Sequence, residues 1–532
     1  MAIINIMNSS KAMRVGYSLA VVTMLLAGQV ALADPLSWVA GDGAWEHATN
    51  WSGGALPTAG DFVDIQHTGS VTSSAADNLA KEFVNKSALS VAAGKLAVTG
   101  TLDTFGVVSV HAGAALDAGR IYVQSGGGLD VSGIGANVNV TEGVFSSGDW
   151  TMALGAALGA ESFDNFNSLV LTSGARATAN SMINHRGSGV SISDANSSLT
   201  IHGNLTNDGT VFVSDQGLLD THSVRNNATI RVTEGSQTAE SIFNRGQGSY
   251  LQIRGANAHL TVSNVVTNGN EDGVGRIEVV EGANAHINNL INDGAVDVNN
   301  GHLTGDDLDN RVGAVVVSAA AVDLTGRLLN SAVLDIDATS VVRTAEFQQS
   351  GGYTSIKGGT LGASSDFGVQ IAAGEFRGHG TIDGKLVLSG TGLLAVDDIP
   401  FFDSVSHFDV MAGLELLGGT FVADLAGTAL GGYDVLNVQG ATILGGTLKV
   451  ALLDGFKPML GDAFDIILAD SIAGAFGTIV LPTLSDGLKF TTLNGGTFFR
   501  LQVAAVPLPA PALLLGGALG VLGYTGRRRR AA

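Results

Sequence analysis

Short runs in which apolar and polar residues alternate fill the middle of the chain. Examples are Ile230-Arg231-Val232, Ile277-Glu278-Val279 and Val296-Asp297-Val298. Successive side chains of a β-strand point to opposite faces, so these runs predict strands with one apolar face turned towards a core.

An asparagine recurs before these runs at a nearly constant interval. The successive intervals are 23, 19, 18, 24, 24, 18 and 20 residues, between Asn184, Asn207, Asn226, Asn244, Asn268, Asn292, Asn310 and Asn330. A repeat of this length is typical of a solenoid in which each repeat forms one coil.

The pattern predicts an all-β chain built on a parallel β-helix. No proline occurs from residue 58 to residue 399, which suits strands that are paired on both edges. Equivalent asparagines, among them Asn207, Asn226, Asn292 and Asn310, are expected to stack and to bond from coil to coil through their amides. An antiparallel sandwich is the alternative, but it does not need a repeat of coil length.

Changes in composition and strand pattern along the chain predict five regions. We expect a signal peptide over 1–33, a Trp-rich cap over 34–66 and solenoid repeats over 67–399. A β-rich module follows over 400–504, where longer apolar strands and paired glycines begin, and a sorting tail follows over 505–532. Trp38, Trp45 and Trp51 would bury much apolar area at the open end of a solenoid. A carbohydrate-stacking platform is the alternative role for these rings.

The composition of the chain excludes several kinds of site and ligand. The chain has no cysteine, which excludes disulfides and thiolate metal sites. Of 27 basic residues six lie in the two ends, so the body between them carries 21 basic against 48 acidic residues, a net charge of −27. Such a body would repel nucleic acid.

The first 33 residues have the layout of a secretory signal. Lys11 and Arg14 precede an apolar run over 15–30, and small residues at Ala31 and Ala33 follow it. Cleavage by signal peptidase is expected after Ala33. An uncleaved anchor is the alternative.

The C-terminal residues have the layout of a second targeting signal. The sequence Val506-Pro507-Leu508-Pro509 precedes an apolar stretch over 512–524, and Arg527, Arg528, Arg529 and Arg530 follow. We expect a single transmembrane helix whose arginines stop transfer on the cytoplasmic side and leave the body outside.

This tail resembles the PEP-CTERM sorting signal of Gram-negative bacteria, with Leu508 where the typical motif has Glu. The resemblance covers residues 506–530 and implies processing by an exosortase-type enzyme, with release to the surface or the exopolysaccharide matrix. The body resembles the passengers of autotransporters. A plain membrane anchor is the alternative for the tail.

Candidate chemical residues are few. Asp306, Asp307, Asp309 and the pair Asp397-Asp398 are interpreted as solvated turn acids, because neighbours on a strand face opposite sides. Residues 268–273 resemble the start of a calcium loop, but Val279 stands where a bidentate Glu is expected. The histidines lack the spacing of a zinc site, so no metal, cofactor or catalytic residue is predicted.

Two functions follow from these features. The favoured one is an exported cell-surface or extracellular-matrix protein with a structural or adhesive role, which binds exopolysaccharide or other surface proteins. The alternative is a carbohydrate-active enzyme, a polysaccharide lyase or hydrolase, on the same scaffold. An enzyme should present a cleft with three or more convergent acidic or basic residues on consecutive coils.

Overall fold

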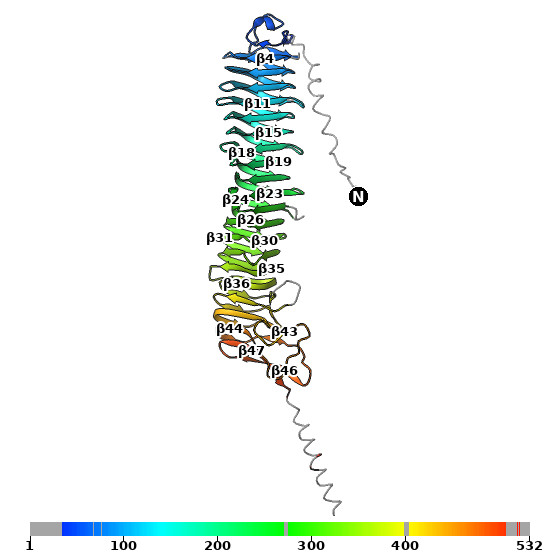
Figure 1. Ribbon diagram of the computed structural model, residues 1–532, viewed down its shortest axis with the longest axis vertical. Coiled ribbons are helices and arrows are strands. Elements are labelled where there is room, and N and C mark those ends of the chain that lie inside the picture. Colours follow the sequence, from blue (N-terminus) through cyan, green and yellow to red (C-terminus); the bar gives the residue numbers. More distant parts are fainter. Residues whose placement is uncertain are drawn as a thin grey trace, which may run out of the picture.

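The chain forms one long parallel β-solenoid of about 16 turns (Figure 1). The computed structural model describes residues 34–66, 69–75, 77–270, 275–397 and 404–506, together with Leu519 and Val521. At the strand spacing of a sheet, about 16 turns correspond to a rod roughly 75 Å long. The predicted all-β class and parallel β-helix are therefore confirmed.

Between residues 157 and 299, each coil contains a long strand and a shorter one. In a central coil, β18 (Ser198–Asn207) shifts its register between Ile201 and Asn204, and this bend divides it into two segments. The third segment is β19 (Thr210–Ser214). Side chains alternate between core and solvent in all three, and those buried are Leu199, Ile201, Leu205, Asn207, Val211 and Val213.

The long strands stack on one another in register through the middle of the rod. They are β14 (Ala157–Asn165), β16 (Arg176–Asn184), β18, β20 (Leu218–Asn226), β22 (Ser236–Asn244), β24 (His259–Asn268) and β26 (Asn284–Asn292), followed by β29 (Asp307–Asn310) and β32 (Arg327–Asn330). Each ends in an asparagine. The eight predicted asparagines thus mark the same corner of successive coils, and Asn165 extends the series to nine.

These asparagines form one continuous internal ladder. The amide nitrogen Nδ2 of Asn207 donates to Oδ1 of Asn226 at 2.8 Å, and Nδ2 of Asn226 donates to Oδ1 of Asn244 at 2.8 Å. The chain of bonds runs from Asn165 to Asn330, with every step between 2.8 and 2.9 Å. All nine side chains are buried, so the predicted stacking is confirmed.

The second strand of each coil forms a parallel stack of its own. The members used below are β19, β21 (Thr229–Thr233), β23 (Ser249–Arg254), β25 (Gly275–Val280), β27 (Ala295–Asn299), β30 (Ala314–Ser318) and β33 (Val333–Ile336). Their outer faces form one long side of the rod.

Three tryptophans close the N-terminal end. The rings of Trp38 and Trp45 meet that of Trp51 edge to face, with centroids 5.0 and 4.7 Å apart. All three are buried, and the indole N–H of Trp51 donates to the carbonyl of Trp45 at 2.8 Å. Parallel pairing begins within this segment, because β1 (Leu36–Ser37) pairs with β3 (Phe62–Ile65).

Parallel pairing also continues beyond residue 400. β39 (His407–Val410) pairs with β42 (Val435–Leu444), and β41 (Thr420–Leu425) pairs with β43 (Thr447–Leu452). The pattern changes only at the end, where β47 (Phe498–Ala505) runs antiparallel to both β44 (Ala463–Gly474) and β46 (Leu488–Asn494). Antiparallel strands thus cover the last coil.

Replacing one ladder asparagine should destabilise the rod locally. Asn226→Ala removes bonds to Asn207, to Asn244 and to the carbonyl of Tyr250 and leaves buried partners unsatisfied, so we expect a loss of about 2–4 kcal/mol. The measurement is the urea midpoint with amide exchange in β20 and β22. The adjacent Asn227→Ala, which loses only a bond to Asp208, is the control. Equal effects of the two changes would contradict a special role for the ladder.

Replacing the buried Gln237 should stabilise the rod, unlike the replacement of a ladder asparagine. Gln237 occupies an inward position that Leu219 and Leu260 fill in the neighbouring coils, and neither end of its amide has a partner among the described residues. Gln237→Leu should raise the free energy of unfolding by roughly 1–3 kcal/mol. The buried Gln349 donates to the carbonyl of Glu375, so Gln349→Leu should gain less. Urea titration of the two variants decides, and a loss of stability in Gln237→Leu would show this interpretation to be wrong.

Candidate functional surface

The outer face of the second strand stack carries an arginine held between two aromatic rings. The guanidinium carbon of Arg231 lies over the ring of Phe212 at 5.8 Å and over that of Tyr250 at 5.7 Å. The three residues come from β19, β21 and β23, and in-register pairing places Phe212 opposite Arg231. Both rings and the cation are therefore positioned by neighbouring coils.

Arg231 has no carboxylate partner among the described residues, although the body is strongly acidic. Its side chain is exposed, and Phe212 is 43% exposed. A guanidinium presents five N–H donors in its plane. These donors are left for a ligand or for water.

A network of polar contacts continues from Tyr250 along the same face. The Tyr250 hydroxyl donates to a carboxylate oxygen of Glu278, and the Gln252 amide donates to the same oxygen at 2.7 Å. Arg276 bridges Glu278 and Asp297 at 2.6 and 2.8 Å. Burial, followed by the bond to Glu278, raises the pKa of Tyr250 to about 12, so its hydroxyl stays protonated at neutral pH.

A shallow hollow of about 260 Å³ adjoins this network. Arg276, Glu278, Asp297, Asn299 and Ser318 contribute polar groups to it, and Val316 adds an apolar side chain. We call Phe212, Arg231, Tyr250, Gln252, Arg276, Glu278 and Asp297 together the Arg231 surface. Sequence reasoning missed it, although Phe212, Arg231 and Tyr250 are 19 residues apart, the same interval as Asn207 and Asn226.

The three predicted acids near residue 307 do not form a two-carboxylate site. The Thr325 hydroxyl donates to Asp306 at 2.6 Å, and the backbone and side chain of Arg327 both bond to Asp307. Asp307 and Asp309 lie on strand β29 and point outward rather than lying in a turn. Separate partners hold each carboxylate.

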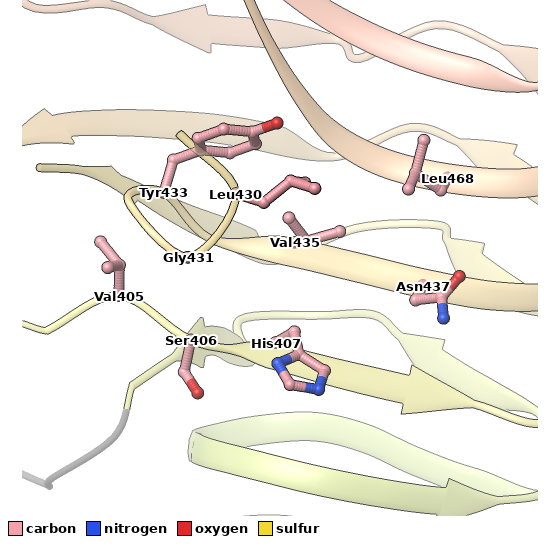
Figure 2. A pocket seen from close by; sticks show the side chains of 9 residues that line it. All are labelled: Val405, Ser406, His407, Leu430, Gly431, Tyr433, Val435, Asn437 and Leu468. Atoms are coloured by element: carbon pink, nitrogen blue, oxygen red, sulfur yellow. The ribbon is translucent and has the colours of Figure 1, made fainter. Parts of the chain in front are cut away.

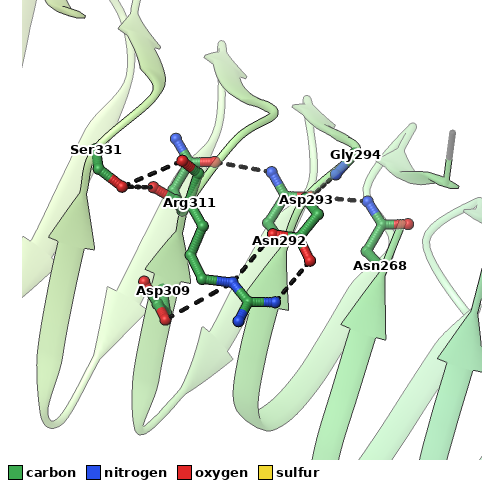
Figure 3. A network of polar contacts seen from close by, with 8 residues as sticks. Asn268, Asn292, Asp293, Gly294, Asp309, Arg311 and Ser331 are labelled. Atoms are coloured by element: carbon green, nitrogen blue, oxygen red, sulfur yellow. Dashed lines mark hydrogen bonds and ion pairs between the residues drawn. The ribbon is translucent and has the colours of Figure 1, made fainter. Parts of the chain in front are cut away.

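Asp309 belongs to a contact network beside the asparagine ladder, which Figure 3 shows. The guanidinium of Arg311 bonds both oxygens of Asp293, at 3.0 and 2.6 Å, and lies 4.0 Å from Asp309. Burial raises the pKa of Asp309, and the positive charge of Arg311 opposes that shift. Asp293 and Arg311 come from neighbouring turns, so this network ties two coils together.

The predicted solvated position of Asp397 is wrong. Its side chain is buried at the end of β38 (Leu393–Val396) and bonds to Arg377 at 2.9 Å. Its neighbour Asp398 lies outside the described residues.

In the calcium-like loop, Asn268 belongs to the ladder, and residues 271–273 lie outside the described chain.

A larger hollow of about 500 Å³ lies over outward side chains at the starts of the paired strands β39 and β42 (Figure 2). Its lining includes His407, Tyr433 and the exposed Leu430, but no carboxylate, lysine or arginine from the described residues. The lining therefore pairs His407 with no carboxylate.

Metal ligands do not gather in the described part of the chain, where no three His, Asp or Glu side chains are placed to hold an ion. His302 contacts Asp323 at 2.8 Å and His222 contacts Glu240 at 2.9 Å. His185 bonds to Asp164 at 3.3 Å and stacks on Phe166. These histidines link neighbouring coils.

The chain leaves the solenoid at Val506, the first residue of the predicted sorting motif. Its amide donates to the carbonyl of Gly487 at 2.7 Å, and its side chain is 48% exposed. Pro507, Leu508, Pro509, the four terminal arginines and the cleavage residues Ala31 and Ala33 lie outside the described residues. So does most of the predicted transmembrane helix. No helix among the residues with described positions is long and apolar enough to cross a membrane.

No protein-family model matches the chain, and a search of curated proteins finds no match. The residues themselves therefore carry the functional argument.

One carboxylate is buried below the 500 Å³ hollow. Asp434 is inaccessible to solvent and accepts the backbone N–H groups of Ser406 and Asp424 at 2.9 and 2.7 Å. Burial raises its pKa well above the ordinary 3.8, and the carboxylates of Asp424 and Asp397 add to the shift.

This buried carboxyl should make stability depend on pH. A pKa that is higher in the folded than in the unfolded chain means that the stability contributed by Asp434 is full below pH 3.8 and is lost as the pH rises through the folded-state pKa. Asp434→Asn removes that loss. The urea midpoint of this variant minus that of wild type should therefore increase as the pH rises from about 4 to 8. Asp409→Asn on β39 controls for the removal of one charge, and parallel pH profiles for wild type and Asp434→Asn would contradict the prediction.

Proposed function

We propose that the chain is an exported structural or adhesive protein of the bacterial cell surface or extracellular matrix, sorted by its C-terminal tail. The observation that carries the proposal is the exit of the chain at Val506. The sorting-like sequence begins where the last strand, β47, ends at Ala505. Cleavage beyond Ala505 would therefore leave every strand of the described body whole.

The form of the body supports this role. The N-terminal segment, drawn in blue next to β4, and β47, which ends at Ala505, lie at opposite ends of the rod (Figure 1). A rod held or processed at its C-terminal end would present its cap and long sides away from the membrane. Repeated coils offer a long surface with many similar positions, which suits binding to a polymer.

The proposed route has three steps. Signal peptidase cuts after Ala33, the apolar tail holds the precursor in the membrane, and an exosortase-type enzyme cuts near Val506-Pro507-Leu508-Pro509. The mature body then reaches the surface or the exopolysaccharide of a Gram-negative bacterium. The order of the motif, the apolar stretch and Arg527 to Arg530 supports this reading.

Removing residues 507–532 should change the destination of the protein. The deletion leaves every strand and the cap intact, so the body should fold while it fails to be retained and processed at the membrane. Fractionation with intact-mass measurement checks this in the native host. A mature wild-type surface product that still carries Arg527 to Arg530 would contradict processing. The tail would then be a lasting anchor.

A second variant, in which the four terminal arginines are changed to Gln, is the matched comparison for the deletion. It keeps the motif and the apolar stretch but loses the charge that stops transfer. We expect mislocalisation again, with the folded body unchanged by circular dichroism. Normal surface display of both variants would refute the proposed role of the tail.

A further inference from the structure

We propose that the Arg231 surface binds the carboxylates of an acidic polysaccharide, with Arg231 as the anionic subsite. The inference rests on the proposed function, because it names the ligand class for an adhesive rod. The carrying observation is the exposed guanidinium of Arg231 between Phe212 and Tyr250. No ion pair of the described residues uses it.

The geometry suits a carboxylate approached from solvent. Both rings pack beside the guanidinium, and its N–H donors point along its own plane. A carboxylate can take two parallel hydrogen bonds from such a fork, which a lysine cannot offer. The rings also restrict the side chain before binding, which lowers the entropy lost on complex formation.

The neighbouring groups suit sugar hydroxyls. Gln252, Glu278 and Asp297 place amide and carboxylate groups on successive coils beside the 260 Å³ hollow. Hydroxyl groups both donate and accept, so they can bond to carboxylates and amides alike. The exposed ring of Phe212 adds an apolar contact at the other end.

The charge along the chain favours this part of the rod for an anion. Residues 34–175 carry 4 basic and 14 acidic groups, and residues 255–397 carry 7 and 17, a net charge of −10 in each case. Residues 176–254 carry 6 of each and are neutral. The screening length at physiological ionic strength is about 8 Å. A ligand at Arg231 therefore lies beside the neutral segment, and the carboxylates of Glu278 and Asp297, which belong to the acidic segment that follows, are bridged by Arg276.

The test is calorimetric titration of the purified body, without its tail, at physiological ionic strength. The probe is an oligogalacturonate of defined length, and its methyl ester, which has the same backbone without the charges, is the ligand control. Wild type should bind the acid and not the ester. Arg231→Gln should weaken binding by about tenfold or more, as expected for a lost charged bidentate contact.

The matched protein control is Arg176→Gln. Arg176 is also exposed and begins β16 on another face of the same neutral segment, so its change removes the same charge. It should alter the affinity by less than about twofold, and Arg231→Lys should recover only part of the loss. Phe212→Ala should weaken binding while leaving the fold unchanged by circular dichroism.

Four results would overturn the proposal. They are no binding of the acid by wild type, equal binding of the ester, equal losses in Arg231→Gln and Arg176→Gln, or self-association through Arg231 without glycan binding. Sedimentation reveals the last of these, in which a second copy occupies the surface. Arg231→Gln in the full chain should still reach the wild-type compartment, so failure of sorting and failure of glycan binding are distinguished.

Discussion

In-register stacking of coils that share one backbone pattern is the constraint on which the rest of the molecule depends, and the asparagine carboxamide enforces it. From Asn165 to Asn310, each ladder side chain donates one N–H to the next asparagine and the other to a backbone carbonyl of the following coil, as Asn207 does to Asn226 and Thr229. A carboxamide has both donor and acceptor, so it can continue such a chain indefinitely. Where the corner residue is Thr104 or Ser146, the hydroxyl bonds back to its own turn instead. Asparagine therefore fixes the corner of each coil relative to its neighbours.

A fixed corner lets the turns vary in length without disturbing the strands. Intervals of 24 residues before Asn268 and Asn292 coexist with intervals of 18, and the ladder bonds stay at 2.8 to 2.9 Å. Close stacking also limits which residues the turns accept. A Cβ on Gly313 would overlap the carbonyl oxygen of Gly294 in the coil below, so glycine is required there. The outward positions of the strands have no such restriction, and this is where Arg231 and its neighbours occur.

The repeat and its ladder could be predicted from the sequence because both depend on one residue type at one interval. The Arg231 surface could not, because outward positions carry different residues in every coil and become neighbours only when the register is known. Asp397 was misplaced for a related reason. It follows a strand and resembles a turn acid in the sequence, but the guanidinium of Arg377, 20 residues earlier in the chain, reaches it inside the rod. The continuation of parallel pairing past residue 400 was hidden by longer strands and new glycine pairs.

Because each coil contacts only its neighbours, the two end coils have no partner on one side and need other means of closure. At the N-terminus the rings of three tryptophans fill that space, and the indole N–H groups of Trp38 and Trp51 bond to backbone carbonyls. At the C-terminus the direction of pairing reverses, so that β47 occupies the open edge of β44, and Arg500 bonds both oxygens of Asp465 across the pair at 2.6 and 2.8 Å. The reversal also sets where the chain departs. A strand that covers the last coil must end at its rim, and Val506 therefore leaves the rod at its end rather than along its side.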